Sequence, residues 1–242
     1  MTEKKRKKDW GPALSLWALL ARCSIYKVLA VLAVMVSTET VLFYKCLRSG
    51  GDYYSLTAVM ENSHLSAVFL AALGLVYILA WTEGRLDTKS SAFMQRLRLS
   101  GSGIFIIKTA YNMACILMLF MTQIWLAVWL INIYGREMAQ IYASPQRLFL
   151  AFYRIDFLHC LLPMADMGKW VRNLLLLLAF GMETARGAGR NYIPLIPLYS
   201  LTVSLFVSSM GGNMTDLICG IMYIMTIAFN ILQVWKAERE GT

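Results

Sequence analysis

Long apolar blocks separated by short polar links run along most of the chain. A bilayer core takes about 20 apolar residues in a helix. Six segments reach that length or come close to it, and they are residues 27–47, 64–82, 104–131, 170–183, 194–210 and 215–235. The fourth is short unless it begins near Asp166. The pattern therefore predicts one all-α integral membrane domain, residues 1–242, with six transmembrane helices.

Two further segments have the pattern of helices that lie along a membrane surface. Apolar side chains recur at helical spacing in residues 11–26, so residues 1–26 predict a cytoplasmic basic tail and an inner interfacial helix. Residues 144–162 begin with a Ser-Pro pair, which is a favourable helix start, and mix apolar with charged positions. They predict an outer amphipathic helix within an outer loop, residues 132–169.

The distribution of basic residues predicts the orientation of the chain. If the N-terminus is cytoplasmic, most of the 23 Lys and Arg residues lie in or beside the inner links. The positive-inside rule then predicts that both termini are cytoplasmic. The composition, 58% hydrophobic and 15% charged, also indicates a membrane protein. Because the net charge of +9 sits beside apolar blocks, we expect it to orient the chain, and we expect no nucleic-acid partner.

Motifs for chemistry are absent from the sequence. It holds no G-x-x-x-x-G-K-[ST], H-E-x-x-H or G-x-S-x-G string, so we expect no catalytic residue, cofactor or enzyme activity in this chain. The five cysteines form no C-x-x-C pair, and His64 and His159 are isolated, so we expect no metal site. Cys46 and Cys160 both fall near the predicted outer face, where a disulfide is an alternative to two apolar thiols.

Polar residues inside the predicted spans are the candidates for a transport route. Glu39 lies in the first span and Gln123 in the third. A carboxylate is costly in lipid, so Glu39 either faces a cavity or a partner helix, or lies close enough to the outer surface to be hydrated. Asn230 in the sixth span suits an interhelical hydrogen bond. Glu183, at the inner end of the fourth span, is expected either to pair with Arg186 or to be solvated.

Residues 83–103, the link between the second and third predicted spans, have the composition of a coupling segment that contacts a soluble partner. Phe93 and Leu97 suit a cleft in that partner, and Arg96 and Arg98 suit its acidic residues. The alternative is a basic interfacial helix that binds anionic lipid. The segment's other basic and apolar members are Arg85, Lys89, Leu86 and Leu99.

This layout resembles the permease subunit of type-2 ABC transporters, small bacterial members included. Residues 11–26 are similar to the connecting helix of that family, and residues 83–105 to its coupling segment. Within the latter, F-M-Q-R-L-R-L-S followed by Gly101 is similar to the family's R-L-x-x-S pattern before the third span. Residues 144–173 look like the outer loop of small bacterial members. One feature departs from many members, since the link between spans five and six is only a short Gly-Gly-Asn-Met turn.

The resemblance implies a membrane subunit that a separate cytoplasmic ATPase drives, with ATP and Mg bound in that partner. It also implies a second permease copy or a homologous permease, membrane lipid as surroundings, and the bacterial inner (plasma) membrane as location. Phe93, Arg96, Leu97 and Arg98 would then be the ATPase-coupling contacts. The apolar spans suit export of an amphiphilic or hydrophobic substrate such as a lipid, peptide or drug.

Two other function classes remain as alternatives. One is a non-transporting assembly factor or sensor that uses the same basic helix to recruit a cytoplasmic partner. The other is an intramembrane enzyme, which would require polar residues to gather at one depth. Glu39, His64 and His159 are the set that such an enzyme would use near the outer face.

Overall fold

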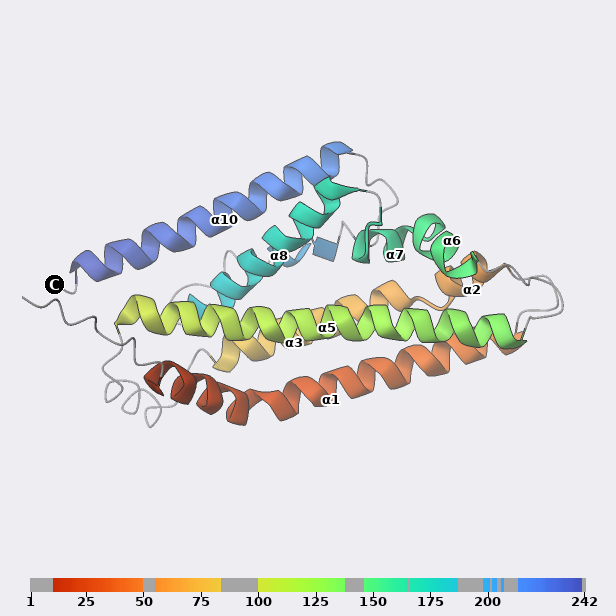
Figure 1. The fold of residues 1–242 in the computed structure, drawn as a ribbon, viewed down its shortest axis with the longest axis horizontal. Coiled ribbons are helices and arrows are strands. Elements are labelled where there is room, and N and C mark those ends of the chain that lie inside the picture. The colour runs from red at the N-terminus through yellow and green to blue at the C-terminus, as the bar shows by residue number, and fades with distance from the viewer. Residues whose placement is uncertain are drawn as a thin grey trace, which may run out of the picture.

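A computed structural model describes residues 11–49, 55–83, 100–137, 146–164, 166–186, 198–200, 202–203, 206 and 213–240 (Figure 1). Its helices are α1 (Gly11–Ser49), α2 (Leu56–Asn62), α3 (Leu65–Glu83), α5 (Gly101–Glu137), α6 (Arg147–Arg154), α7 (Asp156–Leu161), α8 (Met167–Arg186) and α10 (Asn213–Glu240). Residues 198–200, 202–203 and 206 are also helical. The described residues contain no strand, so the prediction of an all-α protein is confirmed.

Four of these helices are long and apolar enough to cross a membrane. They contain the predicted first, third and sixth spans and all of the second but its first residue, His64, and the apolar stretches are Ala13–Ser49, Leu65–Thr82, Gly101–Glu137 and Met214–Arg239. The chain is therefore a multi-pass membrane protein by the length and composition of its helices. The predicted fourth span lies within α8, which has the length but carries Lys169, Arg172, Glu183 and Arg186. Most of the predicted fifth span, residues 194–210, lies outside the described residues.

Helices α1 and α5 are longer than the spans predicted within them. They hold 39 and 37 residues, which is roughly 55–60 Å of helix against about 30 Å of hydrocarbon. The predicted interfacial helix, residues 11–26, is continuous with the first span rather than separate from it. The reason is that Leu16, Leu20 and Ser24 extend one buried face through this region, and α1 packs on α5.

The predicted outer amphipathic helix is instead two short helices. Ile155 has an extended backbone (φ −89°, ψ 110°) and separates α6 from α7. This break lets Phe152 and Phe157 both point into the protein, where each is buried. The Phe157 ring lies 5.6 Å from the ring of Phe69 on α3, centroid to centroid. The segment therefore packs on the bundle, with α6 and α7 both against α5.

Two neighbouring helix pairs run parallel, as hydrogen bonds at both ends of each pair establish. Arg172 of α8 hydrogen-bonds to Asp216 of α10, and farther along both helices Arg186 of α8 hydrogen-bonds to Asn230 of α10. Helices α1 and α5 are parallel by the same argument, from the Ser24–Tyr111 and Glu39–Gln123 hydrogen bonds. As a result α1 begins, α3 ends, α5 begins, and α8 and α10 end at one end of the bundle (Figure 1).

Helix α8 lies between α5 and α10 and approaches α5 closely at Gly181. A Cβ atom at this position would overlap Met113 Cγ and lie 3.1 Å from the Thr109 carbonyl oxygen. A residue without a side chain is therefore required where α8 crosses α5. Aromatic side chains fill the interior of the bundle around Phe69 on α3. The centroid of the Phe69 ring lies 5.4 Å from that of Phe120 and 5.5 Å from that of Phe206.

Candidate functional site

Glu39 on α1 and Gln123 on α5 form a pair in the interior of the bundle. The Gln123 Nε2 donates a hydrogen bond of 2.8 Å to Glu39 Oε2, and both side chains are 0% exposed. The burial excludes the hydrated surface position for Glu39 and leaves the contact with a partner helix. Sequence reasoning selected both residues separately, and the structure brings them together.

The pair is incompletely satisfied. Glu39 Oε1 and Gln123 Oε1 are both buried, and neither has a hydrogen-bond partner. Leaving a buried polar atom without a partner costs about 1–3 kcal/mol. Most buried polar atoms in proteins are paired, so an orphaned pair at one place indicates either a missing ligand or a functional role.

A second polar cluster lies at the end of the bundle where α8 and α10 begin. The Arg172 Nη1 forms an ion pair with Asp216 Oδ1, and its Nε and Nη2 donate to Asn173 Oδ1 at 3.2 and 2.9 Å. The Asn173 Nδ2 donates to the Cys160 carbonyl oxygen at 2.9 Å. Arg172 is 2% exposed. The cluster therefore fastens α7, α8 and α10 to one another, and sequence reasoning missed it by treating Arg172 as an outer-loop charge.

Cys160 and Cys46 are free thiols, so the structure does not contain the disulfide that the sequence left open. Burial raises the pKa of the Cys160 thiol, which keeps it protonated at neutral pH. Both observations fit the alternative of apolar thiols.

A third cluster joins α8 to α10 and α5 toward the other end. The Asn230 Nδ2 donates to Glu183 Oε2 at 2.8 Å, and Arg186 Nη1 donates to Asn230 Oδ1 at 3.2 Å. Asn230 thus bridges Glu183 and Arg186, instead of the direct pair or solvated carboxylate expected. One residue on, Thr184 accepts a 2.8 Å hydrogen bond from Asn112 Nδ2. The prediction of an interhelical hydrogen bond for Asn230 is confirmed.

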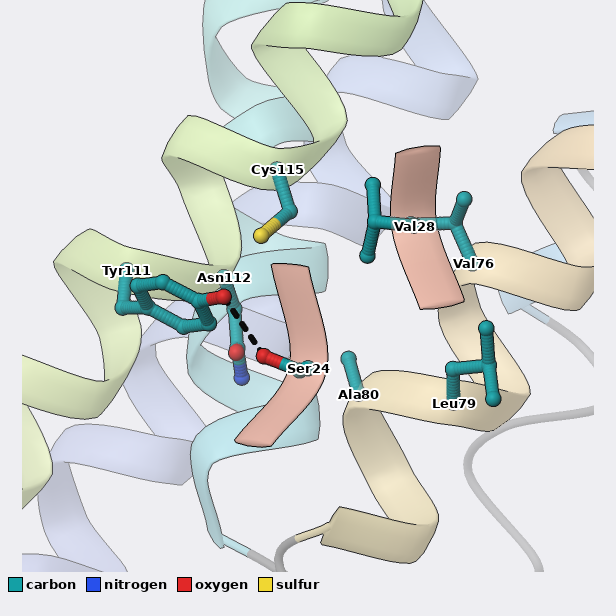
Figure 2. A pocket seen from close by; sticks show the side chains of 8 residues that line it. All are labelled: Ser24, Val28, Val76, Leu79, Ala80, Tyr111, Asn112 and Cys115. Carbon is teal, nitrogen blue, oxygen red and sulfur yellow. Dashed lines mark hydrogen bonds between the residues drawn. The ribbon is translucent and has the colours of Figure 1, made fainter. Parts of the chain in front are cut away.

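A small pocket opens between α1, α3 and α5 (Figure 2). The Ser24 and Tyr111 hydroxyls hydrogen-bond at its edge at 2.5 Å. Because the Ser24 hydroxyl donates to the Leu20 carbonyl oxygen, Tyr111 is the donor to Ser24. No sequence pattern predicts this pocket, because three helices that are far apart in the chain contribute its lining: Ser24, Val28, Val76, Leu79, Ala80, Tyr111, Asn112 and Cys115.

The other predicted site residues do not join these clusters. Phe93, Arg96, Leu97 and Arg98 lie outside the described residues. His159 lies on α7, and His64 is the corner residue between α2 and α3, with φ 51°. Glu39 hydrogen-bonds to neither histidine, and within the described ranges no three His, Cys, Asp or Glu residues are grouped to hold a metal ion. Hydrogen bonds therefore do not join Glu39 to His64 or His159 in the part of the chain that the structure describes.

By the length and composition of its described helices, the chain is an all-α, multi-pass membrane protein with polar pairs in its interior. No family model, curated protein or solved structure matches the chain.

Proposed function

We propose that this chain is the membrane-spanning subunit of an ATP-driven ABC transporter, acting as an exporter of an amphiphilic or hydrophobic substrate. A separate cytoplasmic ATPase supplies the energy, and a second permease copy or a homologous permease completes the complex in a bacterial plasma membrane. The observation that carries the proposal is the position of the link between α3 and α5. Helix α3 ends and α5 begins at the end of the bundle where α1 begins and α10 ends (Figure 1), so the link starts and finishes at that end.

The packing of α8 on α10 supports six crossings. The two helices are neighbours and parallel, so α8 ends and α10 begins at opposite ends of the bundle. We therefore take the predicted fifth span, residues 194–210, as the crossing that joins α8 to α10. With α1, α3, α5, α8 and α10 it makes six crossings, as the resemblance implies. The positive-inside rule assigns the end where the chain starts and finishes to the cytoplasm.

The link itself has the side chains that a coupling contact needs. Phe93 and Leu97 supply apolar anchors, and Arg96 and Arg98 supply charges for an acidic surface. On the bundle side, Ser102 at the start of α5 donates to Glu238 Oε1 near the end of α10 at 3.0 Å. A displacement of the link is therefore transmitted to both α5 and α10.

The buried polar pairs support a route between helices that separate and close. The Glu39–Gln123 contact holds α1 to α5 in the half of the bundle away from the link. Opening a path between these helices in this half requires the Glu39–Gln123 hydrogen bond and the apolar contacts around it to part. Such helix contacts contribute only about 0.6 kcal/mol each on average in membranes, so they suit a reversible gate.

The test is the coupling between hydrolysis and transport in a double variant, Phe93→Asp with Leu97→Asp. The chain is reconstituted in vesicles with an ABC ATPase that co-purifies with it, and a panel of lipid, peptide and drug cargoes is screened for transport. We expect the double variant to retain ATP hydrolysis but to lose its stimulation by substrate and the transport itself. Phe149→Asp is the matched control, because Phe149 is an exposed aromatic residue at the opposite end of the bundle.

Coupled turnover at the wild-type rate in the double variant would sink the assignment of the link. Hydrolysis that no cargo stimulates, in a complex that moves none of them, would instead favour the non-transporting sensor.

A further inference from the structure

In the Glu39–Gln123 pair, two buried oxygen atoms have no hydrogen-bond donor. Gln123 Nε2 already donates to Glu39 Oε2, which leaves Glu39 Oε1 and Gln123 Oε1 as two buried oxygens without a donor. An ionised carboxylate has only acceptor oxygens, and the amide oxygen is also an acceptor. As an ion, Glu39 therefore cannot satisfy either oxygen.

A carboxylic acid satisfies both oxygens at once. With a proton on Oε1, Glu39 donates to Gln123 Oε1 while Gln123 Nε2 donates to Glu39 Oε2, and the two groups form a closed ring of two hydrogen bonds. We propose that Glu39 and Gln123 form a proton-binding site in which one proton, carried by Glu39, closes the contact between α1 and α5. This inference concerns a site of the bundle and does not depend on the proposed ATPase.

No charged group of the neighbouring helices neutralises Glu39. Glu39 forms no ion pair in the described part of the chain, and Gln123 is its hydrogen-bond partner. Without a cation, a buried carboxylate is neutralised by protonation. The titratable side chains on α2, α3 and α5, the helices packed on α1, are Glu61, Tyr77, Glu83, Lys108, Tyr111, Cys115, Tyr134, Arg136 and Glu137, and none hydrogen-bonds to Glu39. Those on α1 itself are Arg22, Cys23, Tyr26, Lys27, Tyr44, Lys45, Cys46 and Arg48, and the same holds for them.

Loss of the proton opens the pair. The proton passes to water that enters the site, the O–H bond of Glu39 breaks, and its electron pair stays on Oε1. Glu39 Oε1 and Gln123 Oε1 are then two acceptors facing one helix interface, so the carboxylate is stable only where water reaches it. Nearer the start of both helices, the uncharged Ser24–Tyr111 hydrogen bond also joins α1 to α5, and loss of the Glu39 proton leaves it unchanged. The two helices therefore separate only around Glu39 and Gln123. Protonation of one residue thereby controls whether α1 and α5 are closed there.

Infrared spectroscopy of the full chain in lipid nanodiscs tests the site. We expect the wild type at neutral pH to have a carbonyl band of a protonated carboxyl group, which Glu39→Gln removes. Gln123→Leu is expected to shift this band to higher frequency, because it removes the hydrogen-bond partner while the acid remains. The matched control is Glu61→Gln, since Glu61 is an exposed glutamate on α2 that leaves the band unchanged.

Thermal unfolding provides the second readout. Glu39→Gln places two amides opposite each other, which form the same two hydrogen bonds without a titrating group, so its Tm is expected to stay near that of the wild type. If this variant fails to fold, labelling the wild-type glutamates with ¹³C at the carboxyl carbon is expected to lower the frequency of the same band. Spectra of the wild type and Glu39→Gln that are identical in this region, or a band that ignores the label, overturn the proposal. A missing band together with a Tm that rises with added NaCl or KCl in the wild type alone would assign a monovalent cation to the site and also overturn it.

Discussion

The ion pair between Arg172 and Asp216 provides the sharpest prediction of stability. We consider Asp216→Leu, Arg172→Leu and the double variant. Asp216→Leu leaves a guanidinium group that is 2% exposed without its carboxylate, and breaking a buried ion pair from one side costs about 3–5 kcal/mol. Arg172→Leu is expected to cost less, about 1–3 kcal/mol, because the Asp216 side chain is 12% exposed and gains water.

The double variant is expected to be more stable than Asp216→Leu. It removes both charges, so the remaining loss is the hydrogen bonds that Arg172 donates to Asn173 and to the Cys160 carbonyl oxygen, about 1–2 kcal/mol in total. A double-mutant cycle should therefore give a coupling energy of at least about 2 kcal/mol. Lys169→Leu is the control from the same helix, since its 3.8 Å pair with the 41% exposed Asp166 should contribute about 0–1 kcal/mol.

The assay is reversible unfolding in mixed micelles of increasing SDS content, followed by tryptophan fluorescence. Additivity of the two single variants would refute the reasoning, because it would mean that the two charges do not depend on each other. A loss in Lys169→Leu as large as that in Asp216→Leu would refute it as well, since burial would then not decide the cost.

Two further predictions concern packing and orientation. Gly181→Ala is expected to destabilise the protein by about 1–3 kcal/mol in the same assay, because the new Cβ meets Met113 and the Thr109 carbonyl oxygen. Gly220→Ala, with nothing within 4 Å, should leave stability unchanged or raise it by up to about 1 kcal/mol, and equal losses in both would contradict the close approach of α8 to α5. In a cysteine-free background, Glu61→Cys should react with a membrane-impermeant maleimide on intact cells, and Gly101→Cys only after permeabilisation. The reverse pattern would invert the proposed orientation.

The long helices could be predicted from the sequence because length and hydropathy are local properties. The four apolar helices contain four of the six predicted spans. The ends of these helices were harder to predict from the sequence. Helix α1 extends through residues 11–26 because this part packs on α5, and composition alone does not show that. The break at Ile155 likewise depends on burial of Phe152 and Phe157 in the bundle, which no local pattern encodes.

The interior contacts were predictable as residues but not as pairs. Glu39 and Gln123 stood out because each is polar within an apolar block, yet their contact depends on the register of α1 against α5. Arg172 was missed because its partner, Asp216, lies 44 residues farther along the chain. A charge next to an apolar block looks the same in sequence whether it faces water or a partner helix.

The proposed function depends on an energy source outside this chain, and one measurement tests that most directly. ATP hydrolysis and cargo movement are recorded in vesicles that hold the purified chain alone, and in vesicles that also hold a co-purifying ABC ATPase with or without a substitution of its Walker A lysine. We predict no hydrolysis by the chain alone, cargo-stimulated hydrolysis and transport in the complex, and loss of both with the lysine substitution. Cargo movement by the chain alone, or movement that survives the lysine substitution, would contradict the proposal.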